Sequence, residues 1–125
     1  METINLSARI KAGRELHKVT LSLIEFNEDN TFIIYSPALD LSGYGYTQEE
    51  AKESFNEALI EFVKYTSNKK TTDKILTSLG WIKKKYHNVS TFSPPKDSDL
   101  IKSNTQYSEI IDNKDYIKKS VELCF

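Results

Sequence analysis

The feature that most constrains the fold is a capped amphipathic helix in the middle of the chain. Thr47 and Glu50 stand three residues apart at its start, which is the spacing of a capping box. A helix with one apolar face has to bury that face against another element, so the rest of the chain must supply one. The apolar side chains that recur at helical spacing up to Tyr65 are Ala51, Phe55, Ala58, Leu59, Phe62 and Val63.

The segments before this helix predict a sheet. Residues 3–10 and 19–26 alternate between apolar and polar side chains, which is the period of half-buried strands. Residues 31–35 are apolar on both faces and predict the central strand. A dense turn signal at 27–30 predicts a hairpin. Together these patterns predict an α+β fold in which a long helix packs across an antiparallel meander.

Two further sequence signals lie near the ends of predicted elements. Gly43 and Gly45, separated by one tyrosine, predict backbone turns that need positive φ or close contacts. Thr71 or Thr72 is expected to cap a second, shorter helix, with Gly80 as its C′ residue.

Weaker patterns follow in the last third of the chain. Residues 83–85 predict a turn or an exposed edge, and 86–92 a strand. Asp97 and Ser98 are expected to cap a helical turn, and the apolar residues near 107–111 predict another short helix. Ile117, Val121, Leu123 and Phe125 alternate with polar residues, interrupted by Lys119. They predict a buried terminal strand that extends the sheet to three or four strands.

Size and composition narrow the possible functions. At 125 residues we expect one domain, residues 1–125, with a core in 1–81 and a C-terminal extension in 82–125. A net charge of -1 provides no global attraction to nucleic acid or anionic lipid. The single cysteine, Cys124, excludes an intrachain disulfide. With no signal-peptide start and no apolar run of membrane length, we expect a cytoplasmic protein without a membrane partner.

Enzyme signatures are missing from the sequence. It contains no P-loop, no dinucleotide-binding glycine motif, no HExxH and no nucleophile elbow. A two-metal nuclease needs several converging carboxylates, and the predicted strands offer only Glu25, with Asp40 just past a strand end. His17 and His87 lie in unrelated segments. We therefore expect no catalytic residue, no metal and no cofactor.

The long helix carries an acidic stripe, formed by Glu49, Glu53, Glu57 and Glu61 at intervals of four residues. Like charges at this spacing destabilise a helix by roughly 0.2–0.5 kcal/mol per pair. Ile60 lies beside the stripe, on the side opposite Phe55. Two interpretations stay open. The stripe is either a solvated face or a docking surface for a basic partner or a second copy of the chain, with Ile60 as an apolar anchor.

A basic segment with interleaved aromatic residues follows the helix. Trp81 and Tyr86 stand among its lysines, and this combination is found in nucleic-acid-binding proteins. The segment has no arginine, which favours a solvated surface, because arginine dominates bidentate phosphate and base contacts. A nucleic-acid-binding module remains the alternative function. Its candidate residues are Lys69, Lys70, Lys74, Lys83, Lys84 and Lys85.

The segment from Tyr35 to Ala51 resembles the HicB antitoxin family. The family pattern is a strand, a "PDLPG"-like segment, a Gly-rich turn and a helix that opens with "T-x-E-E-A". The resemblance extends from about Leu21 to the "LGW" motif at 79–81, roughly half the chain. The matching residues are Pro37, Leu39, Gly43, Thr47, Glu49, Glu50, Ala51, Ala58 and Leu59.

This resemblance implies a partial RNase-H-like fold that lacks the catalytic acids. It also implies that the protein binds a small basic RNA-cleaving toxin. Tyr44 and Tyr46 join the acidic stripe and Ile60 as hypothetical partner-binding residues. Many family members also carry a C-terminal DNA-binding domain, but 82–125 shows neither a helix-turn-helix nor a ribbon-helix-helix pattern, so DNA binding is not expected. A stand-alone HicB-like protein without a toxin partner and a degenerate RNase-H-like enzyme remain further alternatives.

Overall fold

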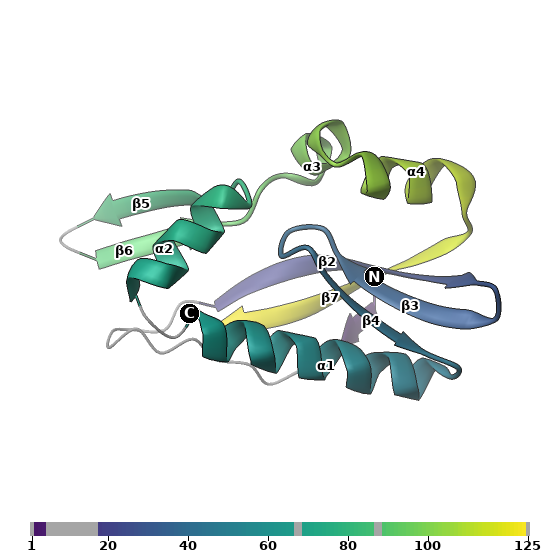
Figure 1. Ribbon diagram of the computed structural model, residues 1–125. Coiled ribbons are helices and arrows are strands. Elements are labelled where there is room, and N and C mark those ends of the chain that lie inside the picture. The colour runs from purple at the N-terminus through teal and green to yellow at the C-terminus, as the bar shows by residue number, and fades with distance from the viewer. Residues whose placement is uncertain (1, 5–17, 67–68, 87–88, 125) are drawn as a thin grey trace.

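The computed structural model of the chain describes residues 2–4, 18–66, 69–86 and 89–124. These residues form an α+β fold, shown in Figure 1. Five strands build the main sheet in the order β1-β7-β2-β3-β4, and β5 and β6 form a separate hairpin. The strands are β1 (Glu2–Ile4), β2 (Lys18–Glu28), β3 (Thr31–Ser36), β4 (Leu41–Gly45), β5 (Ile82–Tyr86), β6 (Val89–Ser93) and β7 (Tyr116–Cys124). The helices are α1 (Gln48–Tyr65), α2 (Lys69–Ser78), α3 (Asp97–Ser103) and α4 (Thr105–Asn113).

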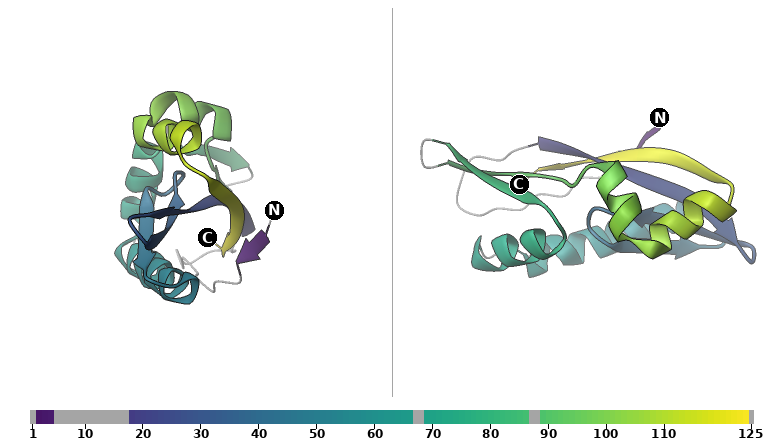
Figure 2. Two further views of the ribbon diagram at one scale, coloured as in Figure 1. Left: turned by 90° about the vertical axis from the view of Figure 1, so that its right-hand side faces the viewer. Right: turned by 90° about the horizontal axis from the view of Figure 1, so that it is seen from above.

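The main sheet is covered on both faces. Figures 1 and 2 show α1 along one face and α3 and α4 over the other, while α2 and the β5–β6 hairpin extend past one end of the sheet. Strand alternation directs Leu23 and Ile34 toward α1, where Phe55 is fully buried. Ile24 and Tyr35 point to the opposite face, where the Tyr35 ring meets Tyr107 of α4 edge-on. The core therefore has two layers, one on each side of the sheet.

The predicted hairpin between β2 and β3 is confirmed. Asp29 and Asn30 occupy its turn with φ of 51° and 63°, the left-handed conformation that a two-residue hairpin turn needs. β3 then pairs with β4 to give an antiparallel meander.

The neighbours of the first strand differ from the prediction. β1 pairs in parallel with β7, with Glu2 opposite Lys119, and residues 5–10 of the predicted strand lie outside the described residues. β7 pairs with β2 over nine residue positions and so occupies the edge of β2 that the meander prediction assigned to the first strand. The middle strand of the sheet is consequently β2 and not β3.

Residues 41–45 form strand β4 and not the predicted turns, although the close contacts expected of the two glycines are confirmed. A Cβ atom on Gly43 would lie 2.3 Å from the backbone nitrogen of Phe55, and one on Gly45 would lie 2.5 Å from that of Ala51. Because such distances are prohibitive, glycine at both positions lets α1 approach the backbone of β4.

The outer edge of β4 is also hydrogen-bonded to α1. The Tyr44 N–H donates to Ser54 Oγ at 3.0 Å, and the Tyr46 N–H donates to Glu50 Oε2 at 2.8 Å. Helix side chains thus satisfy two backbone donors that point away from the sheet.

The helix predicted from Thr47 to Tyr65 is confirmed as α1. Thr47 Oγ1 accepts a hydrogen bond from the Glu50 N–H at 3.1 Å, as an N-cap does. The Glu50 carboxylate accepts from Tyr46, one residue before the donor of a standard capping box. Ala51, Phe55 and Leu59 are fully buried against the sheet, so α1 is a rigidly mounted element.

Helix α2 begins at Lys69, earlier than predicted, so neither Thr71 nor Thr72 is its cap. Thr72 lies inside the helix and its hydroxyl donates to the Thr66 carbonyl. The helix ends at Ser78, and Gly80, with a φ of 89°, takes the C′ position that the sequence predicts for it. The Trp81 N–H donates to the Leu76 carbonyl and the Gly80 N–H to that of Thr77, which is the Schellman arrangement.

The region predicted as one strand, 86–92, belongs to a hairpin of two strands. β5 contains Lys83–Lys85, and it pairs with β6 from Ile82 opposite Ser93 to Tyr86 opposite Val89. The indole Nε1 of Trp81, the residue before β5, donates to the Ala38 carbonyl at 2.8 Å and so links the hairpin to the turn between β3 and β4.

The terminal strand pairs with the sheet as predicted, but its buried side chains are not all ones that the sequence predicts. Ile117 is 52% exposed, whereas Lys119 and Val121 are buried; the side chains of Leu123 and Phe125 lie outside the description. The short helices α3 and α4 precede it, with Lys96 and not Asp97 at the N-cap of α3. β7 lies between β1 and β2, so the last third of the chain supplies an interior strand.

Candidate functional site, a groove between helix α4 and the sheet

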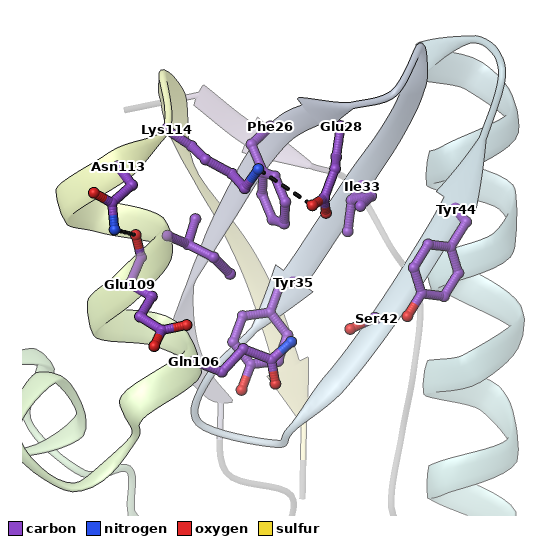
Figure 3. A pocket seen from close by; sticks show the side chains of 11 residues that line it. Phe26, Glu28, Ile33, Tyr35, Ser42, Tyr44, Gln106, Glu109, Asn113 and Lys114 are labelled. Carbon is purple, nitrogen blue, oxygen red and sulfur yellow. Dashed lines mark hydrogen bonds and ion pairs between the residues drawn. The ribbon is translucent and has the colours of Figure 1, made fainter.

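A groove of about 370 Å³ lies between α4 and the β2–β3–β4 part of the sheet. Its sheet side uses residues two apart on each strand, which share one face because side chains alternate along a strand. Its helix side uses residues with helical spacing, which form one face of α4. Figure 3 shows both walls. The sheet contributes Phe26, Glu28, Ile33, Tyr35, Ser42 and Tyr44, and the helical segment contributes Gln106, Glu109, Ile110, Asn113 and Lys114.

The groove is lined by three charged side chains, of which two form an ion pair with each other. Lys114 Nζ lies 3.3 Å from Glu28 Oε1, an ion pair at the surface that contributes about 1 kcal/mol or less. Glu109 is exposed and forms no ion pair among the described residues. The Asn113 side chain donates to the Glu109 carbonyl at 3.0 Å, which orients its amide along the helix. Of the two carboxylates of the groove, only that of Glu28 forms an ion pair among the described residues.

Tyr35 forms a fixed part of the groove wall. Its hydroxyl donates to Asp40 Oδ1 at 2.9 Å and accepts from Asn104 Nδ2 at 2.8 Å. Burial raises the pKa of the Tyr35 phenol to about 12, so the group is neutral at physiological pH. Tyr35 is thus held by neighbours on both sides and presents its ring to the groove.

A second phenol fastens α4 to the rest of the fold. The Tyr107 hydroxyl donates to Asp97 Oδ1 at 2.5 Å, and Lys118 Nζ donates to Asp97 Oδ2 at 3.2 Å. Burial, and then the Asp97 carboxylate, raise the pKa of Tyr107. This link joins α3, α4 and β7 and fixes the helix wall of the groove.

We expect the free energy of unfolding to decrease as the pH rises above 10. Tyrosine in an unfolded chain ionises near pH 10. In the folded protein the pKa of Tyr35 is about 12, and that of Tyr107 is raised as well. The stabilisation from these raised pKa values is fully present below pH 10 and is lost as the pH approaches the folded value. Urea unfolding at about pH 8, 10 and 11 measures this loss.

Phenylalanine variants separate the tyrosines from the lysines that titrate in the same range. The Tyr35→Phe and Tyr107→Phe double variant should show a shallower decrease above pH 10. Tyr44→Phe is the matched control, because Tyr44 is 57% exposed. Equal slopes for the double variant and the unchanged protein would contradict the prediction.

The acidic stripe lies exposed on α1, as its spacing predicts. Glu49 pairs with Lys52 at 3.8 Å and Glu61 with Lys64 at 3.7 Å. The two middle residues, Glu53 and Glu57, are exposed and form no ion pair among the described residues. Ile60 beside them is half-buried, so less of its surface is available than an exposed anchor would offer.

The structure separates Tyr44 from the stripe. Gly43 faces α1, so the side chain of the next residue, Tyr44, points to the opposite face of the sheet and lines the groove. Tyr46 is 79% exposed just before the start of α1. The hypothetical partner-binding residues therefore occupy two faces that meet at the β4 edge.

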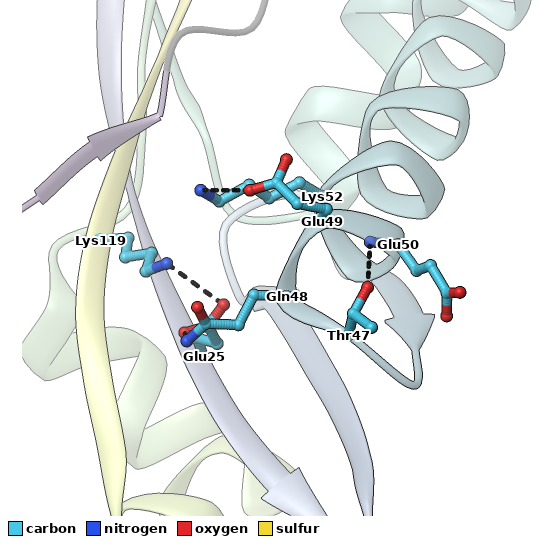
Figure 4. Close-up of polar contacts among 7 residues, drawn as sticks. All are labelled: Glu25, Thr47, Gln48, Glu49, Glu50, Lys52 and Lys119. Atoms are coloured by element: carbon cyan, nitrogen blue, oxygen red, sulfur yellow. Dashed lines mark hydrogen bonds and ion pairs between the residues drawn. The ribbon is translucent and has the colours of Figure 1, made fainter.

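The two acids considered for metal chemistry also lie on opposite faces. Glu25 lies on the α1 side, where its carboxylate binds Lys119 Nζ at 3.2 Å and Gln48 Nε2 at 3.4 Å, as Figure 4 shows. Asp40 accepts a hydrogen bond from Tyr35 on the α4 side. Among the described residues no three His, Cys, Asp or Glu side chains are grouped so that they could hold a metal ion.

The structure describes the side chains of three of the six candidate lysines, Lys74, Lys83 and Lys84. Lys83 binds Asp73 at 2.5 Å, and Lys84 points to the other face of the hairpin. Lys74 is exposed on α2. Lys69 and Lys70 lie in the first turn of α2 and Lys85 lies in β5, but the description does not include their side chains.

Sequence reasoning missed the helix side of the groove. The spacing of Gln106, Glu109, Ile110 and Asn113 was a usable signal, because it places one apolar residue among polar ones on a single helical face. The sequence does not show that this face of α4 packs against the hairpin of β2 and β3, because the two are far apart along the chain.

Among the described residues no helix is long and apolar enough to cross a membrane. No family model, curated protein or solved structure matches this chain.

Proposed function

We propose that this chain is a non-enzymatic protein-binding module of the HicB antitoxin type, with a partial RNase-H-like sheet. In this proposal it works in the cytoplasm and neutralises a small basic RNA-cleaving toxin by covering the surface that contacts RNA. The observation that carries the proposal is the pair of exposed carboxylates of Glu53 and Glu57, which have no ion-pair partner among the described residues.

Electrostatic complementarity explains why such a pair suits a basic partner. Repulsion between glutamates four residues apart weakens a helix, and opposite charge on a partner relieves it. Because Ala51, Phe55 and Leu59 are fully buried, α1 keeps its place on the sheet and displays these carboxylates in fixed positions. Ile60 adds partly exposed apolar surface beside them.

The surroundings of the strand acids support the non-enzymatic part of the proposal. Glu25 is 3% exposed and its charge is met by buried Lys119. Asp40 lies on the other face of the sheet. A nuclease of the two-metal type needs carboxylates that converge on one metal site, and these two do not.

The test is co-expression with the small basic protein that the proposal requires in the neighbouring reading frame. The complex should co-purify. A Glu53→Gln and Glu57→Gln double variant should associate roughly 3- to 10-fold more slowly at low salt, with a smaller difference at high salt. Ile60→Ala should instead speed dissociation, because an apolar anchor acts after encounter.

A charge-matched control is available on α4 and beyond it. The Asp112→Asn and Asp115→Asn double variant makes the same change in net charge at exposed positions outside α1. It should associate at nearly the unchanged rate. A neighbouring frame without such a protein, or equal association rates for both double variants, would overturn the proposal.

A further inference from the structure

We propose that the groove between α4 and the sheet receives an apolar side chain that is flanked by lysine or arginine on the partner. The inference rests on the proposed function, because it assumes a basic protein partner and identifies a second contact for it. It concerns the face of the sheet opposite to α1.

The shape of the groove fits a single large side chain. Phe26 and Ile33 line its floor and are almost fully buried, whereas Tyr44 stands at its outer wall with 57% of its surface exposed. Ile110 completes the apolar lining from α4. The volume of about 370 Å³ is near the lower end of the range of ligand pockets, roughly 300–1,000 Å³. An aromatic side chain would cover the floor and pack against Tyr44.

The negative charge of the groove favours an inserted side chain with lysine or arginine beside it. The charges of Glu28 and Lys114 offset each other, so the remaining charge of the lining residues is that of Glu109. Figure 3 shows the Glu109 side chain on the helix wall, across the groove from Tyr44. A lysine or arginine beside the inserted side chain would be attracted by this carboxylate and by the Tyr44 ring. An acidic flank would be repelled.

The position of the groove also fits a partner that contacts α1. β4 is the outer strand of the sheet, with α1 on one face and the groove on the other. Tyr44 and Tyr46 are both exposed where the two faces meet. A basic partner on α1 therefore needs only a segment that passes this edge to insert a side chain into the groove.

Three blocked tripeptides test the inference by NMR titration of the isotopically labelled full chain. The probes are Lys-Trp-Lys, Lys-Ala-Lys and Glu-Trp-Glu. Lys-Trp-Lys should shift the backbone amide signals of Ile33, Tyr44 and Ile110. Loss of the indole should weaken binding about tenfold, and reversal of the flanking charge should weaken it by about two- to fivefold or more.

Variants identify the groups responsible. Glu109→Gln should reduce the preference for Lys-Trp-Lys over Glu-Trp-Glu. Asp112→Asn on the same helix should leave that preference unchanged, because Asp112 does not line the groove. Gln106→Trp replaces an exposed lining residue with one that fills the groove, and it should abolish the shifts while the rest of the spectrum keeps its folded pattern.

The outcomes separate this inference from the proposed function. Shifts that cluster away from the groove, equal affinity for the two tryptophan peptides, or unchanged binding to Gln106→Trp would each overturn the inference. The Glu53→Gln and Glu57→Gln variant should bind Lys-Trp-Lys normally, since these residues lie on α1. If the co-expression test failed and the peptide still bound, the proposed toxin partner would be rejected, and the groove would remain a peptide-binding site.

Discussion

A chain that stops at Tyr116 should not form a stable domain. It would lack β7 after the first residue of that strand, and β7 lies in the sheet between β1 and β2. Burial of Val121 and of its partner Leu21 depends on this strand. Each such side chain contributes about 1.5–3 kcal/mol when buried, whereas a whole domain has about 5–15 kcal/mol of stability. Circular dichroism should show no cooperative thermal transition.

A point substitution in the full chain provides the control for this truncation. Ile117 is the second residue of β7 and is 52% exposed. Ile117→Ser keeps the strand and should change the free energy of unfolding by about 0.5 kcal/mol or less. A truncated chain that melts cooperatively within a few degrees of the full chain would show that β7 is dispensable.

Replacing Lys119 with methionine should lower the free energy of unfolding by about 3–5 kcal/mol. Lys119 and Glu25 are each 3% exposed, and their side chains form an ion pair at 3.2 Å between β7 and β2. The substitution leaves the Glu25 carboxylate in the interior without that cation. Gln48, the first residue of α1, still donates a hydrogen bond to this carboxylate, but the bond is long, at 3.4 Å. Chemical denaturation monitored by tryptophan fluorescence measures the change.

Two further variants distinguish a missing charge from a missing side chain. The Glu25→Met and Lys119→Met double variant should recover most of the lost stability, because a buried ion pair can be replaced by apolar residues of similar volume at little cost. Lys118→Met alters the next residue, whose ion pair with Asp97 is partly exposed, and should cost about 1 kcal/mol or less. If the double variant were as unstable as Lys119→Met, the ion pair would not be the cause.

The elements predicted correctly from the sequence are those that local chemistry determines. Asp29 and Asn30 favour a tight turn, and Thr47 with the apolar spacing behind it defines α1. The sequence does not predict β4, because glycine is unfavourable in strands. The close approach of Phe55 explains why Gly43 stands in this strand. Pairing of β1 with β7 joins opposite ends of the chain, and no local pattern contains that information.

The candidate site also has a part that local sequence predicts and a part that it does not. Exposure of Glu53 and Glu57 follows from helical spacing, so the sequence was enough to predict it. The groove brings Ile33 and Ile110 together from segments far apart in the chain, and its volume depends on how α4 is held by the link between Tyr107 and Asp97. In the sequence Lys119 interrupts an apolar strand, and the buried ion pair with Glu25 explains why a lysine stands there.

The hydrogen bonds from the outer edge of β4 to α1 have a consequence for behaviour in concentrated solution. An unpaired strand edge is a template on which other chains can add strands and begin fibrils. At this edge the N–H of Tyr44 donates to Ser54, and just beyond the strand the N–H of Tyr46 donates to Glu50. An incoming strand would have to displace both side chains of a helix whose neighbouring residues are fully buried. Growth of fibrils by strand addition at this edge should therefore be suppressed in the folded protein.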